Sequence, residues 1–139
     1  MSFVTDTHKN SLKLKAVQRQ IAVAVPPIIA KQADDVLRRS IRNLDGARYL
    51  PGTLPVRFVS GELKKSMRRI MINKYAHVIF SNDNTAHYNK YVHDGTLSDE
   101  GGWKMKPRRF LGDVVRERRQ AIKNNLRYGI IKAIRAVGR

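Results

Sequence analysis

Three short motifs in a fixed order constrain this chain more than any other feature of its sequence. They are SGELKKS at residues 60–66, YNKYVHDGT at residues 88–96 and KPRRFLG at residues 106–112. None of them is a catalytic motif. Each instead contains residues that begin or end helices, so that together they predict a helix start, a helix stop within a turn, and a second helix start. This organisation is typical of an assembly component rather than an enzyme.

The local chemistry of the first two motifs supports this interpretation. Ser60 is a good N-cap, and Glu62 suits the first turn beside the positive end of a helix. Gly95 follows Asp94 and suits the left-handed conformation that often ends a helix. In the second motif, the spacing of Tyr88, Tyr91 and Val92 favours packing of a short helix onto a sheet, with base stacking as the alternative.

The N-terminal third of the chain predicts helix. Apolar residues recur three and four apart over residues 12–25, and again on one face of residues 28–44. Pro26-Pro27 separates the two segments, so two helices and one bent helix are both compatible with the sequence. Residues 1–10 are polar, and we expect them to form an extended N-terminal arm.

The middle of the chain predicts strands and loops. Residues 46–59 contain turn-forming proline and glycine and predict a loop. Branched and aromatic residues around Asn73-Lys74 and on to Phe80 predict an antiparallel hairpin or two sheet strands. We expect a short helix over residues 85–93 and then a long exposed loop over residues 95–109.

The last helix is predicted most clearly, from Asp113 onward. Arginine and lysine occupy the faces opposite its apolar stripe, which is formed by Val115, Ile122, Leu126, Ile130, Ile134 and Val137. We therefore predict one α+β domain over residues 1–139. Its small antiparallel β-sheet would be packed by a long N-terminal helix and a long basic C-terminal helix.

Charge separates this chain from ordinary globular proteins. Its 28 Lys and Arg against 11 Asp and Glu give a formal net charge of +17. Such a field favours nucleic acid, an anionic membrane or an acidic protein surface as partner. The apolar stretch of residues 21–30 is too short to span a bilayer and sits too far along the chain for a secretory signal, so we expect synthesis in the cytosol and no membrane partner.

The sequence offers little for chemistry at a site. There is no cysteine, no nucleophile elbow and no glycine-rich phosphate loop. His87 and His93 are six residues apart and have no accompanying ligand cluster, which favours surface or capping roles over metal binding. We therefore expect no enzyme activity, no metal and no cofactor.

The three motifs, in their order and spacing, resemble those of the HK97 gp10-like family of tailed-phage neck or tail-completion proteins, to which the Mu-like virion-morphogenesis proteins are related. Members of that family have Ser/Thr-Gly-x-Leu-basic-basic-Ser, then Tyr-Ala-x-x-Val-Glu-x-Gly-Thr, then Arg-Pro-Phe-Leu before a C-terminal helix. The resemblance covers residues 30–125. This chain departs from the pattern at His93-Asp94 and at Arg108-Arg109.

The resemblance implies a structural virion protein that forms a ring at the head–tail junction. The implied partners are other copies of the chain, six by the symmetry of phage tails, a portal or connector protein, and a tail-tube or tail-terminator protein. Loops 46–59 and 95–109 would contact neighbouring subunits or rings. In loop 95–109 the reason is that exposed aromatic and Met side chains are enriched at interfaces, with a Trp103 folded back onto its own domain as the alternative. The residues that we assign to this interface are Tyr91, His93, Gly95, Thr96, Trp103, Met105, Arg108 and Phe110.

The basic face of the C-terminal helix has two functional interpretations beside the simpler one of a solvated face, although its basic side chains are more numerous than solubility requires. It could line a ring lumen and neutralise the phosphates of passing DNA without reading bases, or it could face an acidic surface on a neighbouring ring. The alternative to a virion role is a small nucleic-acid-binding protein that acts outside the virion. The side chains assigned to this face are Arg116, Arg118, Arg119, Lys123, Arg127, Lys132 and Arg135.

Overall fold

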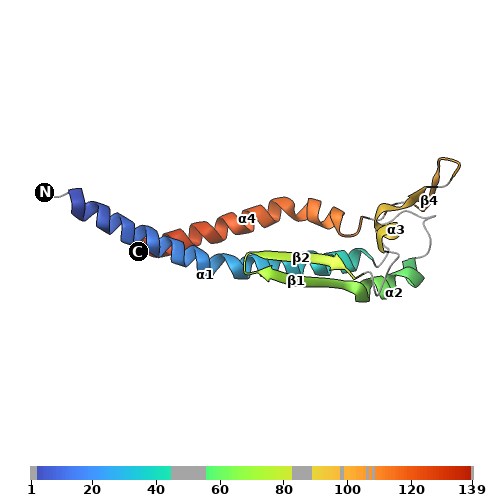
Figure 1. Ribbon diagram of the computed structural model, residues 1–139, viewed down its shortest axis with the longest axis horizontal. Coiled ribbons are helices and arrows are strands. Elements are labelled where there is room, and N and C mark those ends of the chain that lie inside the picture. The colour runs from blue at the N-terminus through green and yellow to red at the C-terminus, as the bar shows by residue number, and fades with distance from the viewer. Residues whose placement is uncertain are drawn as a thin grey trace.

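Two long helices and a β-hairpin form the body of the protein (Figure 1). The computed structural model describes residues 3–44, 56–82, 89–97, 99–105, 107 and 109–138. Helices α1 (Phe3–Asn43) and α4 (Gly112–Val137) run antiparallel, and the hairpin of β1 (Met67–Asn73) and β2 (Ala76–Ser81) packs on the C-terminal half of α1. This arrangement confirms the predicted α+β class. The smaller elements gather at one end of the elongated molecule and are α2 (Val56–Ser66), α3 (Asn89–Asp94), β3 (Thr96–Leu97) and β4 (Trp103–Met105).

Helix α1 is continuous and contains both Pro26 and Pro27. An internal proline removes a backbone hydrogen bond and costs about 3 kcal/mol or more. Packing along α4 offsets that cost, since most helix stability in proteins comes from tertiary contacts. Residues 3–10, which we expected to be extended, form the first turns of the same helix. That expectation was wrong because extending an existing helix requires no new nucleus and therefore no apolar periodicity.

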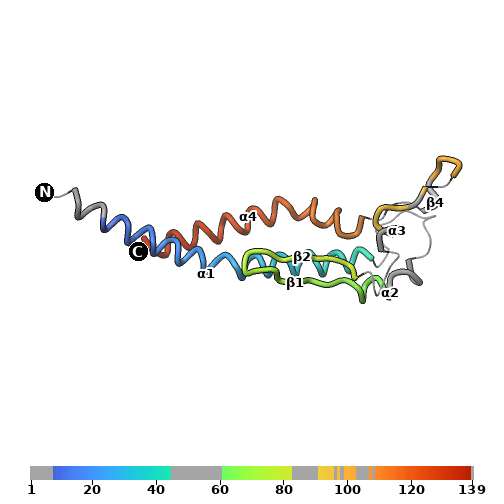
Figure 2. The backbone as a smooth tube through the Cα atoms, viewed as in Figure 1, coloured from blue at the N-terminus to red at the C-terminus, as the bar shows by residue number. Residues whose placement is uncertain are grey.

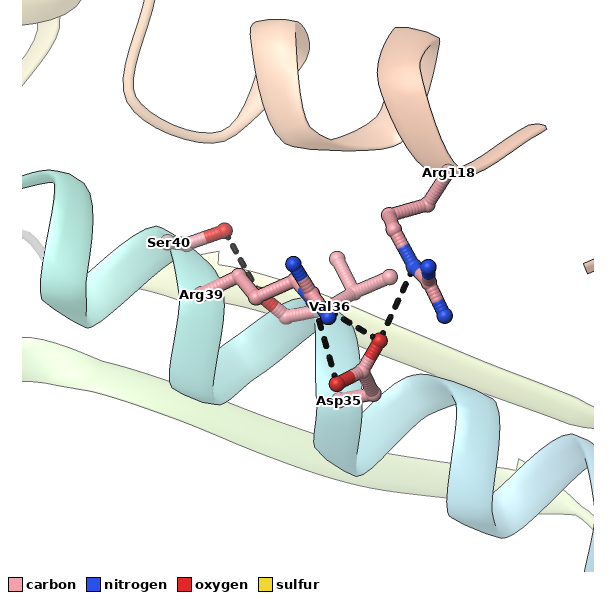
Figure 3. Close-up of polar contacts among 5 residues, drawn as sticks. All are labelled: Asp35, Val36, Arg39, Ser40 and Arg118. Atoms are coloured by element: carbon pink, nitrogen blue, oxygen red, sulfur yellow. Dashed lines mark hydrogen bonds and ion pairs between the residues drawn. The ribbon is translucent and has the colours of Figure 1, made fainter. Parts of the chain in front are cut away.

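The separation between α1 and α4 changes along their length. Figure 2 shows that the two backbones diverge toward the start of α4. At the narrow end, a Cβ built on Gly129 would lie only 2.1 Å from Cδ1 of Ile28, so the absence of a side chain permits the close approach. Toward the wider end, Nε of Arg118 lies 3.0 Å from Oδ2 of Asp35 (Figure 3). Gly129 thus fits where the two helices are close, and the long side chain of Arg118 fits where they are further apart.

The buried face of α4 differs from the predicted apolar stripe. Val114, Gly129 and Ala133 are buried, whereas Val115 and Ile134 are exposed. The prediction misplaced the edges of the stripe because hydrophobicity gives no weight to glycine and little to alanine. Close helix packing selects small residues at these positions.

Helix α2 begins at Val56, four residues before the predicted N-cap. Ser60 therefore lies inside the helix and Glu62 lies beyond its first turn, so both capping assignments were wrong. The predicted loop over residues 46–59 is helical from Val56, and its earlier residues lie outside the described part of the chain. The helix ends at Ser66, close to the expected position, and the chain enters β1 directly.

Of the two alternatives predicted for residues 70–80, the structure has the antiparallel hairpin, β1–β2. Arg69 pairs with Ile79 and Ile70 pairs with Val78, with a register shift between Met71 and Asn73. One face of the hairpin is turned toward α1, as the distance of 2.9 Å from Nε of Arg69 to Oδ1 of Asp34 shows. Asp34 and Asp35 are neighbours in α1, so these adjacent carboxylates bind the hairpin on one side and α4 on the other.

The segment over residues 95–109 contains a second hairpin where we expected only a loop. Strands β3 and β4 pair antiparallel, with Thr96 opposite Met105. Gly101 lies in the turn with a φ of 85°, a left-handed conformation that favours glycine. The hairpin projects from the end of the molecule near α3 (Figure 1).

The three sequence motifs meet in one core at this end of the molecule. Leu63 comes from the first motif, Val92 from the second and Phe110 from the third, and all three are buried together with Leu44 and Met67. Ile41 and Ile79 pack against this cluster from α1 and β2. Segments far apart in the sequence are thus joined by their apolar residues.

Candidate functional site

The strongest functional feature is an uneven distribution of charge along the molecule. Residues 8–33 and residues 118–139 contain five and seven Lys or Arg respectively, and neither segment contains Asp or Glu. These segments form the half of the molecule away from α2 and α3, where α1 and α4 run side by side (Figure 1). All the acidic residues between His8 and Arg139 are therefore outside this two-helix end, which we call the basic end.

Most of the cations on the basic end are exposed. On α4, exposed side chains extend from Arg119 to Arg135. Arg119, Lys123 and Arg127 are four residues apart and therefore form one row along the helix. On the part of α1 that belongs to the basic end, the exposed cations are Lys9, Lys13, Lys15, Arg19 and Lys31.

Two of the seven arginines and lysines that we assigned to the basic face of the C-terminal helix have partners within the chain. Nη2 of Arg116 donates a hydrogen bond to Oδ1 of Asp113 at 2.9 Å while the Arg116 side chain stays exposed. Arg118 instead turns inward, with 26% of its side chain exposed, and forms its ion pair with Asp35 across the helix interface. Its N–H is not aligned with the carboxylate, so this contact is an ion pair without a linear hydrogen bond. Arg118 therefore faces α1 rather than solvent and is removed from the partner-facing set.

A shallow hollow lies on the surface of α4 near its C-terminal end. Tyr128, Lys132, Arg135 and Ala136 line it, and the Tyr128 side chain is 71% exposed. An exposed aromatic ring beside two cations suits a phosphodiester with an adjacent base, because cations neutralise phosphate and aromatic rings stack on bases. The sequence identified both cations, but Tyr128 was missed because nothing in the periodicity distinguishes it from a packed residue.

The second motif forms a helix end around Gly95. This residue has a φ of 76°, and its N–H donates to the carbonyl of Tyr91 at 2.9 Å, which confirms the predicted left-handed helix stop. His93 places Nδ1 2.7 Å from Oδ1 of Asp94, and its ring meets Phe110 edge to face at 5.4 Å. Because Phe110 is buried, it has no surface to offer a neighbouring subunit, and we withdraw it from the predicted interface.

The structure describes the remaining interface residues to different extents. Tyr91 is exposed, so the predicted packing of this aromatic onto a sheet was wrong, whereas Val92 does pack in the core. Thr96, Trp103 and Met105 lie in the paired strands β3 and β4, where only the backbone is described. Arg108, and the 83–88 segment that holds His87, lie outside the described residues.

Metal and membrane sites are not evident in the described part of the chain. There, no three His, Asp or Glu side chains gather closely enough to hold a metal ion. Nor does any described helix combine the length and apolar character that a membrane span requires. His77 lies in a different environment, with Nδ1 3.0 Å from Nη1 of Arg69.

The sequence analysis missed an exposed apolar surface on the β1–β2 hairpin. Ile70, Ile72 and Val78 are 50%, 64% and 39% exposed. Branched residues in a strand normally indicate burial. Only the observed sheet, which has two strands, shows that one face of the hairpin has nothing covering it in the described chain.

Comparison with known proteins gives no independent assignment. No protein-family model, no curated protein and no solved structure matches this chain. The motif resemblance to the HK97 gp10-like family therefore stays a prediction, and the function must be argued from the residues and the geometry described above.

Proposed function

We propose that this chain is a structural virion protein of a tailed bacteriophage, which forms an oligomeric ring at the head–tail junction and joins the connector to the tail. The observation that carries the proposal is the convergence of Leu63, Val92 and Phe110 in one buried cluster. The three motifs resemble those that occur in the same order in the HK97 gp10-like family, and their occurrence together calls for a structural explanation. A shared core supplies that reason without any catalytic role.

The basic end supports a role in which one half of each subunit faces a polyanion. Packaged DNA passing through the ring is the favoured partner, since exposed cations in rows neutralise phosphates without reading bases. An acidic surface on a neighbouring ring is the alternative within the same function. In either case, the end of the molecule that carries the sheets would be left for contacts between subunits.

The implied partners follow from the resemblance. They are further copies of the chain, with six expected from tail symmetry, together with a portal or connector protein and a tail-tube or tail-terminator protein. The function needs neither chemistry nor a cofactor, since the proposed mechanism is mechanical and electrostatic.

A second candidate is a small nucleic-acid-binding protein that acts outside the virion. The specific observation in its favour is that residues 8–33 and 118–139 lack any acidic residue. This candidate explains the charge but gives no reason for the ordered motifs. The two functions differ in whether the protein assembles without nucleic acid and in whether it remains in mature particles.

The deciding experiment is to locate the chain in purified phage particles with a labelled antibody and by direct imaging. We expect signal only at the head–tail junction, at a fixed copy number for each particle. Absence from mature particles would overturn the virion proposal and favour the nucleic-acid binder.

The role of the basic end can be measured separately with the purified protein and duplex DNA. Reversing Arg119, Lys123 and Arg127 to Glu should weaken binding and lower the salt slope by roughly 0.9 for each phosphate that the protein no longer neutralises. The matched control reverses Arg38, Arg42 and Lys65, three exposed cations near the sheet end. Equal weakening in both triple variants would show that net charge, rather than the basic end, determines binding.

A further inference from the structure

The β1–β2 hairpin has one face turned away from α1. Side chains alternate between the two faces of a strand. Arg69 pairs with Asp34 of α1, so Arg68 and Ile70 lie together on the other face, away from α1. Val78 lies directly opposite Ile70 and shares its face. Ile72 follows at the register shift and is also exposed. The outward surface therefore has an apolar centre, which we call the hairpin face.

This surface is unusual for a protein that acts alone. A two-stranded hairpin has an unpaired edge on each side, and exposed branched residues on such a ribbon promote association. The cations near the hairpin face are Arg68, toward the base of the hairpin, and Lys74 in its turn, where Nζ lies 5.0 Å from the centroid of the Tyr75 ring. The hairpin face thus presents apolar side chains with a basic margin.

The second hairpin has the complementary chemistry. In β3, Leu97 is 66% exposed, and the turn that follows contains Asp99 and Glu100, both exposed. Neither acid pairs with a basic side chain in the described chain, although the protein carries a net charge of +17. This hairpin projects from the molecule beyond α3 (Figure 1). Its end, which we call the acidic tip, joins an apolar side chain to two unpaired carboxylates.

We propose that the acidic tip of one copy of this chain docks on the hairpin face of the next copy. Leu97 would cover Ile70 and Val78, and the positive field of Arg68 and Lys74, at the two ends of the hairpin face, would attract Asp99 and Glu100. Charge complementarity identifies the occupant, because an equally basic surface from another part of the chain would be repelled.

The proposed contact predicts the symmetry of the assembly. The hairpin face and the acidic tip are different surfaces on one chain, so the contact is heterologous and generates a ring if the rotation closes. The basic ends would not have to touch each other and would remain available for DNA or an acidic partner. This inference rests on the proposed ring and names the surfaces that would build it.

Charge reversal tests the contact by light scattering after size-exclusion chromatography. One variant, Arg68→Glu with Lys74→Glu, makes the hairpin face acidic, and a second, Asp99→Lys with Glu100→Lys, makes the tip basic. Each variant alone should elute as a monomer, while an equimolar mixture should assemble again, because every contact in an alternating ring then joins opposite charges. The control variant reverses Lys13 and Lys15, which lie on the far part of α1, and should assemble as the wild type does.

The possible outcomes distinguish failure of the proposed contact from failure of the proposed ring. Assembly of the wild type and of both reversed variants would overturn the proposed contact but leave a ring that uses other surfaces. Monomers in the mixture as well as in the separate variants would also overturn it. A wild-type protein that stays monomeric at all concentrations would overturn the proposed ring and the contact together.

Disulfide trapping tests the same contact without requiring a closed ring. Because the chain has no cysteine, Ile70→Cys and Leu97→Cys can each be made singly in an otherwise thiol-free protein. Mild oxidation of the two mixed variants should yield a covalent dimer at least several-fold above the level from Ile70→Cys mixed with Leu14→Cys, an exposed control position on α1. Equal yields from both mixtures would contradict the proposed docking.

Discussion

Arg118 of α4 and Asp35 of α1 form an ion pair that bridges the two long helices, with Nε 3.0 Å from Oδ2. Asp35 also accepts hydrogen bonds from Nε of Arg39, one turn further along α1, at 3.0 and 3.1 Å (Figure 3). One carboxylate thus orients a cation of its own helix and one of the partner helix. The pair lies toward the end where the helix backbones diverge (Figure 2).

The Asp35–Arg118 ion pair should contribute more to stability than the neighbouring Asp34–Arg69 pair. We predict that Asp35→Asn lowers the free energy of unfolding by about 1–2 kcal/mol, because it leaves the partly buried Arg118 without its counter-charge. The matched control is Asp34→Asn, one residue away, where the carboxylate is 48% exposed and the loss should stay below about 1 kcal/mol. Urea denaturation of both variants checks this, and equal losses would contradict it.

Gly129 and Ile28 should be energetically coupled. Gly129→Ala gains helix propensity of about 1 kcal/mol, but its Cβ would collide with Cδ1 of Ile28. Ile28→Val removes that methyl group. We predict that Gly129→Ala is more favourable by about 1–2 kcal/mol in the Ile28→Val background than in the wild type. Thermal unfolding of the four proteins measures the coupling, and simple additivity would show that the two residues do not constrain each other.

Gly95 and Gly61 should respond to substitution in opposite directions. Gly95 has a φ of 76°, so Gly95→Val should cost about 2 kcal/mol and Gly95→Asn less, since asparagine tolerates this conformation better. Gly61 lies inside α2 with open space around its Cα, so Gly61→Ala should stabilise by up to about 1 kcal/mol. Urea midpoints report both effects. A Gly95→Val protein as stable as the wild type would refute the role of Gly95 as a helix stop.

The buried Ser66 should be more sensitive than the buried Ser40. The Ser66 hydroxyl donates to the Leu63 carbonyl at 2.7 Å, which leaves the Ser81 hydroxyl to donate to it across 2.6 Å from β2. Ser40 only donates to the carbonyl of Val36 in its own helix. We predict a loss of about 1–1.5 kcal/mol for Ser66→Ala and about half of that for Ser40→Ala. Urea denaturation of the two variants measures the difference, and equal losses would mean that the bond to Ser81 adds nothing.

Local sequence patterns identified most of the elements but not all of their ends. Helix periodicity predicted α1 and α4, and branched residues predicted the β1–β2 hairpin. Ser60 was assigned as an N-cap because its side chain suits that position, yet α2 begins earlier at Val56. A capping residue placed inside a helix carries no signal that distinguishes it from a true cap. The short β3–β4 hairpin was missed because strands of two and three residues are too brief to show alternation.

The candidate site was predicted in part. The cations of α4 were identified from composition, and their exposure follows from their position opposite an apolar stripe. The sequence also contained the full extent of the basic end, since the absence of acids from residues 8–33 and 118–139 is visible without a structure. Joining those two segments, however, requires knowledge that α1 and α4 lie side by side.

The sequence by itself determined the fold class, the two long helices, the first hairpin, the left-handed stop at Gly95 and the excess of positive charge, because each depends on residues close together in the chain. The tertiary structure alone decided that α1 continues through Pro26-Pro27, that Arg118 faces Asp35 instead of solvent, that Phe110 is buried and that the hairpin face is exposed. These outcomes depend on contacts between distant segments, whose free energies exceed local preferences of about 1–3 kcal/mol.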